Sequence, residues 1–277
     1  MKIVTAKNLS KSFGQQNVLD EISFSIETGE IIGLVGRNGC GKTTLMKMIL
    51  GLSSPTSGSL HVKENLKIGF LLDCKLFEYL TAMENIKVFS KYSEELKGKD
   101  IEMIAKELLE FVGLDSNIKK PVKSFSFGMK QRLGLALSLL EQPEFLVLDE
   151  PFVGLDVVGI KKFMDYIEKI RNNFGTTILI SSHQLSEIEE ICDRFMIIKN
   201  KRLIQSDEIR EEKVLFTIEK LTNLKTKRLT GLHFYNSQTV MINNQSSEIN
   251  EFFTKAVENN LRIKKISFLK DANDIFE

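Results

Sequence analysis

The order of apolar and polar residues divides the start of the chain into short strands and one helix. Residues 2–30 alternate between the two kinds, which predicts two or three antiparallel strands with turns at Gly14 and at Thr28–Gly29. The continuous apolar run 30–36 (EIIGLVG) predicts a buried central strand. The spacing of apolar residues in 42–52 (KTTLMKMILGL) predicts that a helix follows this strand.

Beyond residue 52 the pattern predicts a loop over 53–60 (SSPTSGSL), and then strands that alternate with helices. Apolar runs predict strands over 65–73, 144–151 and 176–183, and a hairpin over 195–204. Helical spacing predicts helices over 81–92, 100–114, 127–140, 159–174 and 184–194. This alternation is typical of an α/β fold with a largely parallel sheet whose faces are covered. The block from about 75 to 140 is mainly helical and is expected to form a subdomain.

The composition changes after about Glu211. Four short patterned segments follow, in the order strand, strand, helix, strand: 213–220, 233–244, 246–261 and 262–268. We therefore expect two domains, a larger one over 1–210 and a small α/β unit over 211–277.

Charge and cysteine content narrow the class of protein. The 38 Lys and Arg residues balance 37 Asp and Glu residues, which argues against a broad basic face for nucleic acid. The three cysteines are scattered, which predicts free thiols in a reducing compartment. No apolar run approaches the roughly 18 residues that span a bilayer, and the first residues lack the apolar core of a signal peptide. A cytoplasmic location is expected.

A phosphate-binding loop follows the first central strand. The stretch GLVGRNGCGKTT contains the pattern G-x-x-x-x-G-K-T between a predicted strand and a predicted helix. Glycines at 36, 39 and 41 allow backbone N–H groups to turn toward phosphates. Lys42 adds a positive charge, and the Thr43 hydroxyl is a hard oxygen ligand for Mg²⁺. The sequence thus predicts a nucleoside triphosphate site.

Cys40 lies inside this loop, and two interpretations of it stay open. It is either a small filler residue or a thiol whose pKa is lowered by the nearby helix N-terminus.

Acidic and basic side chains end two of the predicted strands. Asp149 and Glu150 follow the apolar run FLVL, at the strand end where an α/β sheet binds ligands. Asp149 is expected to hold Mg²⁺ through water, and Glu150 to act as a general base or to orient the attacking water. His183 ends the next strand and is expected to lie near the γ-phosphate.

Taken together, residues 1–205 resemble the nucleotide-binding subunit of an ATP-binding cassette (ABC) transporter, because six motifs occur in that family's order. GRNGCGKT resembles the Walker A motif, FLVLDEP the Walker B motif, FSFGM the signature motif and GLD (154–156) the D-loop. His183 stands at the position of the switch histidine. Phe13, with Val18 beside it, stands where the family places an aromatic residue that stacks on adenine.

This resemblance implies a fold, an activity and two cofactors. The implied fold is α/β, a P-loop NTPase with a central mostly parallel sheet, an antiparallel β subdomain, a helical signature subdomain and a small C-terminal α/β appendage. The implied activity is Mg²⁺-dependent ATP hydrolysis coupled to transport, with ATP and Mg²⁺ bound.

The resemblance also assigns residues to these roles. The implied nucleotide-binding residues are Phe13, Val18, Gly36, Arg37, Asn38, Gly39, Cys40, Gly41, Lys42, Thr43, Thr44, Ser126, Gly128 and Asp156. The implied catalytic residues are Glu150, His183 and Lys42, and the implied Mg²⁺ residues are Thr43, Asp73 and Asp149.

The implied mechanism needs other chains. In the family, two cassettes pair head to tail, and each ATP lies between the Walker A loop of one and the signature helix of the other. The chain shows no internal repeat and no membrane segment. The second cassette, expected to be a second copy, and the membrane permease are therefore expected to be separate chains. The complex would lie on the inner face of the cell membrane, and no nucleic acid partner is expected.

Two positions depart from the family pattern. Asp73 stands where a glutamine is usual, and Phe127 stands within a signature that is usually written LSGGQ. We expect Phe127 to project away from the nucleotide into the helical subdomain, while Ser126 and Gly128 meet the γ-phosphate of the opposite subunit.

The variant signature is similar to one branch of the family. FSFGMKQRLGLALSLL and SSHQLSEIEEICDR resemble the branch associated with bacitracin resistance and lantibiotic immunity, which implies export of peptide antibiotics or other amphipathic compounds. Two alternatives stay open: a translation or repair factor of the ABC type, and a regulatory nucleotide switch.

Overall fold

We describe a computed structural model of the chain, covering residues 1–72, 75–184, 187–205, 213–218, 233–236, 239–243, 252–256 and 263–269. The chain divides into two compact units, 1–205 and 206–277. The assignment of two domains with a boundary at residue 210 stays a prediction.

An antiparallel sheet of three strands begins the first unit. Its strands are β1 (Lys2–Phe13), β2 (Gln16–Glu27) and β4 (Ser57–Val62), in the order β2-β1-β4. The predicted hairpin with a turn at Gly14 is confirmed, but the predicted loop over 53–60 is wrong from Ser57 onward. This segment pairs with β1, and a side chain at Gly58 would lie 2.1 Å from the Asn8 carbonyl oxygen. Glycine therefore permits a backbone approach that local sequence does not reveal.

The second sheet has six strands in the order β5-β6-β7-β3-β8-β9. The strands are β3 (Ile31–Val35), β5 (Ile68–Leu71), β6 (Phe145–Leu148), β7 (Thr177–Ser182), β8 (Arg194–Lys199) and β9 (Arg202–Gln205). All neighbours are parallel except β8 and β9, which form the predicted hairpin. Every residue of β3, β6 and β7 is buried, as expected for a parallel sheet covered on both faces.

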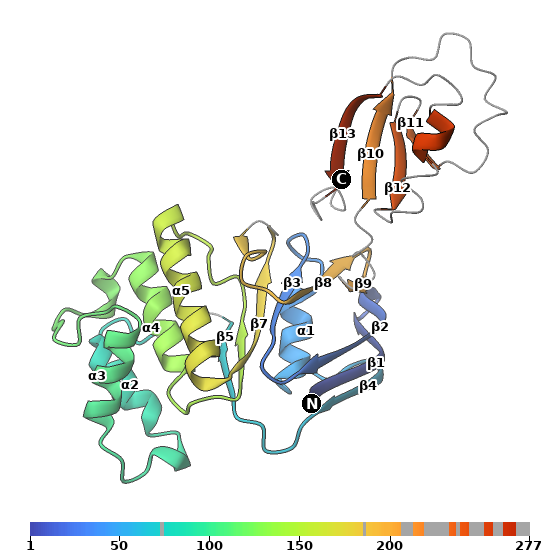
Figure 1. Cartoon of the computed structure of the whole chain (residues 1–277). Helices are drawn as coiled ribbons and strands as arrows, with labels where there is room; N and C mark the ends of the chain where they lie inside the picture. The colour runs from blue at the N-terminus through green and yellow to red at the C-terminus, as the bar shows by residue number, and fades with distance from the viewer. Residues whose placement is uncertain are drawn as a thin grey trace. The chain divides into compact units, whose positions relative to one another are not determined.

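The described residues of the first unit contain five α-helices, which Figure 1 labels. They are α1 (Lys42–Ile49), α2 (Ala82–Ser90), α3 (Ile101–Phe111), α4 (Phe127–Ser138) and α5 (Val157–Phe174). Short 3₁₀ turns occupy Glu94–Leu96 and Val122–Ser124. Helices α2, α3 and α4 pack against one another and form the predicted helical subdomain.

Side-chain caps explain where several of these helices begin. Thr81 and Glu84 form a reciprocal capping box at α2, and Asp100 accepts hydrogen bonds from two backbone N–H groups of α3. The hydrogen bond that the Thr81 backbone N–H donates to the Glu84 carboxylate lowers the pKa of Glu84. Ser126 and Asp156 cap α4 and α5 in the same way. Two residues of the family motifs thus also have a local role in folding.

The helix predicted over 184–194 is wrong for the described residues 188–193, which form a turn over 188–191 and a bend at Asp193. Ile188 is fully buried beneath Gly33, and the Asp193 carboxylate accepts a hydrogen bond from the Ile31 backbone N–H at 2.8 Å. These long-range contacts hold the segment close to the sheet as it leads into β8, and they override its helical spacing.

The hydrophobic core holds α1 between the two sheets of the first unit (Figure 1). Leu45, Met46, Met48 and Ile49 of α1 are buried with apolar residues of β1, β2 and β3. Full burial of one such side chain contributes about 1.5–3 kcal/mol, so the helix is firmly anchored. The loop that leads into α1 is consequently held at the C-terminal edge of β3.

The second unit contains an antiparallel sheet in the order β11-β12-β10-β13. Its strands are β10 (Lys213–Ile218), β11 (His233–Asn236), β12 (Thr239–Asn243) and β13 (Ile263–Leu269). Residues 252–256 are helical. The single strand predicted over 233–244 is in fact two strands that pair with each other.

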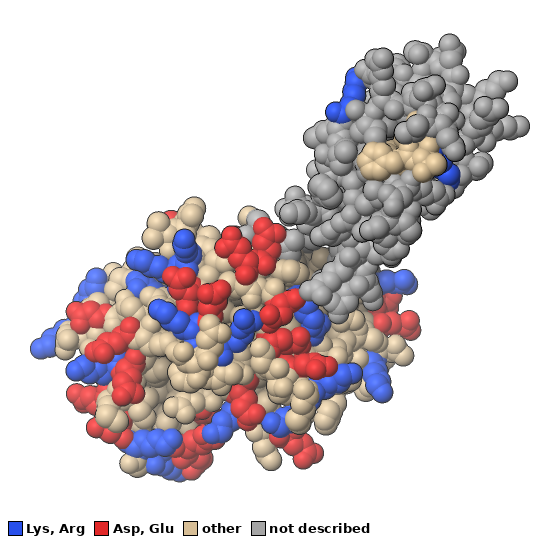
Figure 2. Space-filling model, viewed as in Figure 1, with Lys and Arg blue, Asp and Glu red and all other residues tan. Residues whose placement is uncertain are grey.

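Two properties concern membranes and surface charge. Within the described part of the chain, no helix is both long and apolar enough to cross a membrane. Figure 2 shows acidic and basic side chains interspersed over the visible face of residues 1–205.

Candidate nucleotide-binding site

The loop between β3 and α1 is shaped by three glycines. Gly39 and Gly41 have φ angles of +79° and +114°, which L side chains rarely adopt. A side chain at Gly36 would lie 2.5 Å from Cys40 Sγ and 2.9 Å from the Ile198 carbonyl oxygen. A bare Cα at Gly36 therefore makes room for the Cys40 side chain as well as for the turn itself.

The N-terminus of α1 is open toward this loop. Among the described residues no side chain caps it, and its first turn contains no acidic residue. The first N–H groups of a helix and its dipole attract anions when no cap competes. The position thus suits a phosphate group, as the sequence predicts.

Lys42 is held between the loop and the end of β6. It is only 5% exposed, and its Nζ donates a hydrogen bond to the Gly36 carbonyl oxygen at 2.6 Å. The same Nζ lies 3.0 Å from Glu150 Oε1. Glu150 Oε1 is buried and makes no hydrogen bond to any described residue, so Lys42 supplies its compensating charge.

Asp149 is bonded from two sides. The Thr43 hydroxyl donates to Asp149 Oδ2 at 2.5 Å, and the Ser181 hydroxyl donates to Asp149 Oδ1 at 2.6 Å. Thr43 is the second residue of α1, Asp149 follows β6 and Ser181 lies in β7. The fold therefore brings the predicted residues Thr43 and Asp149 together and adds Ser181, which sequence reasoning missed. The polar pair Ser181–Ser182 at the end of an apolar run was the only signal for it.

Glu150 is also bonded to the next strand end. His183 Nδ1 lies 2.8 Å from Glu150 Oε2, and the Glu150 backbone has φ of +46°. Non-glycine residues in this region of φ are uncommon, and they cluster at functional sites. We call the six residues Lys42, Thr43, Asp149, Glu150, Ser181 and His183 the strand-end cluster.

The hairpin of β1 and β2 lies beside the loop. A side chain at Gly41 would approach Val18 Cγ1 to 3.0 Å, so Val18 packs against the loop. Phe13, at the end of β1, is 54% exposed, and the ammonium group of Lys11 lies 4.8 Å from its ring centroid. Because the side chain is half exposed, the ring face that Lys11 does not cover is available for stacking.

The signature residues belong to a different part of the first unit. The Ser126 hydroxyl accepts a hydrogen bond from the Met129 backbone N–H at 3.3 Å, and a side chain at Gly128 would lie 3.1 Å from Leu155 Cδ2. Asp156 accepts a hydrogen bond from the Gly159 N–H at 2.8 Å. We call residues 126–128 the signature turn.

Phe127 lies elsewhere than expected. Its side chain is 48% exposed, and its ring packs against Gly154, where an added side chain would approach the ring to 3.0 Å. The expectation that it enters the helical subdomain is wrong, because the loop after β6 passes beside the start of α4. Gly154, with φ of +76°, leaves room for the ring there.

The residues present fit a Mg²⁺ ion bound with a nucleotide. Thr43 and Asp149 offer hard oxygen atoms that already lie within hydrogen-bond distance. Among the described residues no three His, Cys, Asp or Glu side chains cluster as a complete metal site. Phosphate oxygens and waters would supply the other ligands, as is usual for Mg²⁺. Asp73, the third predicted ligand, lies outside the described residues.

Burial raises the pKa of the Cys40 thiol, and this effect outweighs the nearby Lys42 charge, which lowers it. The interpretation of Cys40 as a thiol with a lowered pKa is therefore wrong. The filler interpretation agrees with its packing over Gly36.

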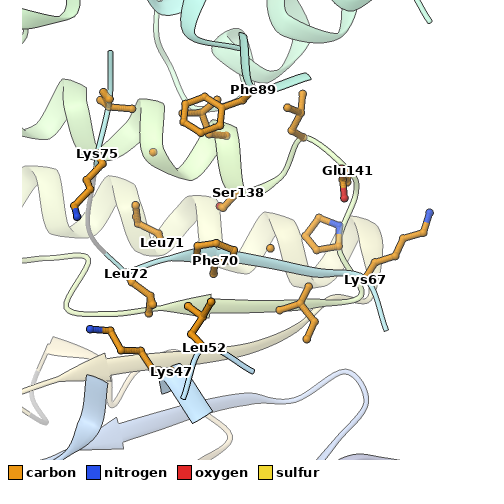
Figure 3. Close-up of a pocket in the computed structure, with 17 residues that line it drawn as sticks. Lys47, Leu52, Lys67, Phe70, Leu71, Leu72, Lys75, Phe89, Ser138 and Glu141 are labelled. Carbon is orange, nitrogen blue, oxygen red and sulfur yellow. The ribbon is translucent and has the colours of Figure 1, made fainter. Parts of the chain in front are cut away.

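A cleft of about 590 Å³ lies between β5 and α4 (Figure 3). Phe70, Leu71 and Leu72 contribute apolar side chains along it. Lys47 and Lys75 lie at one end of the view, and Lys67 and Glu141 lie at the other.

Comparisons with known proteins place these features among ABC proteins. The sequence profile of the family described as "ABC transporter" matches residues 19–153. The uncharacterized ABC transporter ATP-binding protein YcbN of Bacillus subtilis (strain 168) is 37% identical over 87% of this chain and 84% of YcbN. The bacitracin transport ATP-binding protein BcrA of Bacillus licheniformis is 41% identical over 73% of this chain and 69% of BcrA. The lantibiotic transport ATP-binding protein SrtF of Streptococcus pyogenes is 40% identical over 73% of this chain and 89% of SrtF.

Solved structures agree with these relatives. CbiO1 from Clostridium perfringens, part of the ABC transporter complex CbiONQ, has a TM-score of 0.67 and 26% identity, over 76% of this chain and 91% of its own. The ATP-binding cassette MJ0796, solved as a dimer in a post-hydrolysis state with ADP and Pi, has a TM-score of 0.64 and 25% identity. That match covers 72% of this chain and 96% of the cassette.

Proposed function

Since this chain belongs to the ABC transporter ATP-binding proteins, we propose that it hydrolyses ATP to power an exporter of peptide antibiotics or other amphipathic compounds. The observation that carries the proposal is the strand-end cluster, in which a loop lysine, a helix hydroxyl, two carboxylates and a histidine meet. The names of BcrA and SrtF, which specify bacitracin and lantibiotic transport, support the class of substrate.

In this proposal the loop and the first turn of α1 bind the phosphates. Backbone N–H groups of residues 36–44 and the Lys42 ammonium face the β- and γ-phosphates. Phe13 stacks on the adenine ring, and Val18 supports the loop beneath it. Thr43 and Asp149 hold Mg²⁺, which neutralises phosphate charge when it is bound. A contact from Asp73 to this ion or its water stays a prediction.

Glu150 and His183 act on the attacking water. Glu150 accepts the water's proton or orients it, and His183 holds the carboxylate through the 2.8 Å contact to Oε2. The same carboxylate now pairs with Lys42. A triphosphate would compete for Lys42 and thereby free Glu150 Oε1 for the water.

The signature turn serves a second cassette, which we propose is another copy of the chain. Ser126 and Gly128 stand at the N-terminus of α4, which the Ser126 hydroxyl caps, and there a hydroxyl and a bare backbone can meet a γ-phosphate. Asp156 lies close by at the start of α5. The dimeric state of the MJ0796 cassette supports this arrangement.

We also propose that the cleft between β5 and α4 receives a cytosolic segment of a separate permease on the inner face of the membrane. Its apolar length and the lysines at its ends suit an apolar segment that carries an acidic residue near Lys47 and Lys75. The charge reversal Lys47→Glu should release the permease in a co-purification assay. Lys106→Glu, on the exposed face of α3, is the control. Equal retention of the permease by both variants would contradict this docking site.

The activity is tested with the complex of this chain and its permease. We expect Mg²⁺-dependent ATP hydrolysis, and we expect Lys42→Ala to abolish it, whereas Lys106→Ala should not change it. Cells that express the complex should survive bacitracin or a lantibiotic better than cells with the Lys42→Ala complex. No hydrolysis by the wild-type complex would refute the ATPase, whereas hydrolysis without protection would refute only the substrate class.

A further inference from the structure

Ser181 connects both carboxylate residues of the strand-end cluster. It is fully buried, at the second-last position of β7. Its hydroxyl accepts a hydrogen bond from the Glu150 backbone N–H at 2.7 Å and donates one to Asp149 Oδ1 at 2.6 Å. A serine hydroxyl has one proton and two lone pairs, so both bonds form at once.

The register of the sheet explains this position. Strands β6 and β7 are parallel, and Leu148 lies opposite Ile180. The next residues along each strand, Asp149 and Ser181, are therefore neighbours beyond the last pair. The side chain of Ser181 reaches across to the backbone where the chain leaves β6.

That backbone needs support. Glu150 adopts φ of +46°, a backbone conformation that is unfavourable for a residue with a side chain. Its backbone N–H is held in place by the hydrogen bond to the Ser181 hydroxyl. Asp149 has its other oxygen, Oδ2, bonded to Thr43. If Thr43 were bound to Mg²⁺ instead, the Ser181 hydrogen bond would still orient the Asp149 carboxylate.

We propose that Ser181 is a positioning residue that sets the placement of Asp149 and Glu150 relative to each other. The inference rests on the proposed function, in which Asp149 holds the metal ion and Glu150 acts on the attacking water. Ser181 holds a metal-associated carboxylate from behind, and loss of such a partner typically lowers metal affinity or activity about 10–100-fold.

The experiment compares Ser181→Thr with Ser181→Val in the complex with permease. The two new side chains have nearly the same shape and differ in the hydroxyl. A third variant, Ser181→Ala, removes the hydroxyl without adding volume. The control is Thr177→Val at the other end of β7, where a buried hydroxyl accepts a hydrogen bond from the Gly29 N–H at 2.9 Å.

Two measurements are made on each variant. The first is ATP turnover as a function of Mg²⁺ and of ATP concentration. The second is the binding of Mn²⁺, as a spectroscopic substitute for Mg²⁺, with a non-hydrolysable ATP analogue, followed by electron paramagnetic resonance. We expect Ser181→Ala and Ser181→Val to lower kcat and to weaken Mn²⁺ binding, each by about 10-fold or more, with the KM for ATP nearly unchanged. Ser181→Thr should retain most of both properties.

The inference is overturned if Ser181→Val and Ser181→Thr behave alike, or if Ser181→Ala affects kcat and Mn²⁺ binding no more than Thr177→Val. Thermal unfolding of all four variants identifies any general loss of stability. If the wild-type complex did not hydrolyse ATP, the proposed function would fail. The Mn²⁺ measurement would still decide whether Ser181 orients the carboxylate.

Discussion

The strand-end cluster and the signature turn differ in how much of their bonding lies within one chain. In the cluster, the polar side chains bond to one another at 2.5–3.0 Å across α1, β6 and β7. In the signature turn, Ser126 caps its own helix, and Phe127 and Gly128 pack against Gly154 and Leu155.

This difference separates two kinds of contribution to one reaction. Groups that are already bonded and oriented within one chain can act on a bound ligand without reorganisation. Groups at an exposed helix N-terminus act only when a ligand is brought to them. Substitutions in the cluster should therefore affect chemistry in each cassette, whereas substitutions in the signature turn should act through the second cassette.

The largest effect is expected for Gly128→Asp, which places a carboxylate at the N-terminus of α4. Hydrolysis should fall more than about 100-fold, because the new charge repels a γ-phosphate that the turn should attract. Binding of ATP to the separated cassette should be nearly normal. Turnover is measured by phosphate release, and binding with a fluorescent ATP analogue.

Gly128→Ala is the matched control, since its added Cβ lies 3.1 Å from Leu155 Cδ2 and requires only a small shift. Loss of ATP binding by the Gly128→Asp monomer would contradict the claim that the signature turn acts only through the second cassette.

Glu150→Gln should lower turnover about 100-fold or more, because it removes the base while keeping the shape of the side chain. ATP should still bind and should hold two cassettes together, which size-exclusion chromatography detects. Glu144→Gln, on the exposed side just before β6, is the control. Normal turnover by Glu150→Gln would exclude Glu150 as the base.

Phe127→Ala should have a smaller effect, mainly on stability. Because half of the side chain is exposed, its removal should cost about 1 kcal/mol, or about 2–4 °C in Tm. ATP-induced dimerisation in the Glu150→Gln background should be nearly unchanged. A Phe127→Gly variant with strongly raised turnover and unchanged Tm would show instead that the ring restrains the reaction.

The smallest effect concerns Cys40. Burial raises its thiol pKa, so at about pH 7 even less of it is thiolate than in an exposed cysteine, and the reactive fraction grows only as pH rises. Alkylation by iodoacetamide, followed by mass spectrometry of the Cys40 peptide, should be slow and should increase with pH. An exposed cysteine introduced as Lys106→Cys is the control. Fast alkylation of Cys40 at neutral pH would contradict the packing described for the loop.

Local sequence determined the features that are encoded by short stretches of neighbouring residues. The glycines and Lys42 of the phosphate loop, the carboxylates after β6 and the histidine after β7 follow strands that continuous apolar runs reveal. Parallel strands end at one edge of a sheet, so the meeting of Asp149, Glu150 and His183 was also predictable. Helix starts at Thr81 and Asp100 follow from their capping side chains.

Only the tertiary structure decided features that depend on distant partners. Residues from Ser57 form a strand because β1 offers them an edge, and 188–191 form a turn because Ile188 and Asp193 contact β3. The ring of Phe127 lies against Gly154 because the loop after β6 passes there. Ser181 acquired its two carboxylate neighbours through strand register, for which its own sequence segment carries no pattern. Such contacts join residues far apart in the chain, and their free energy depends on the packed fold and not on local preference.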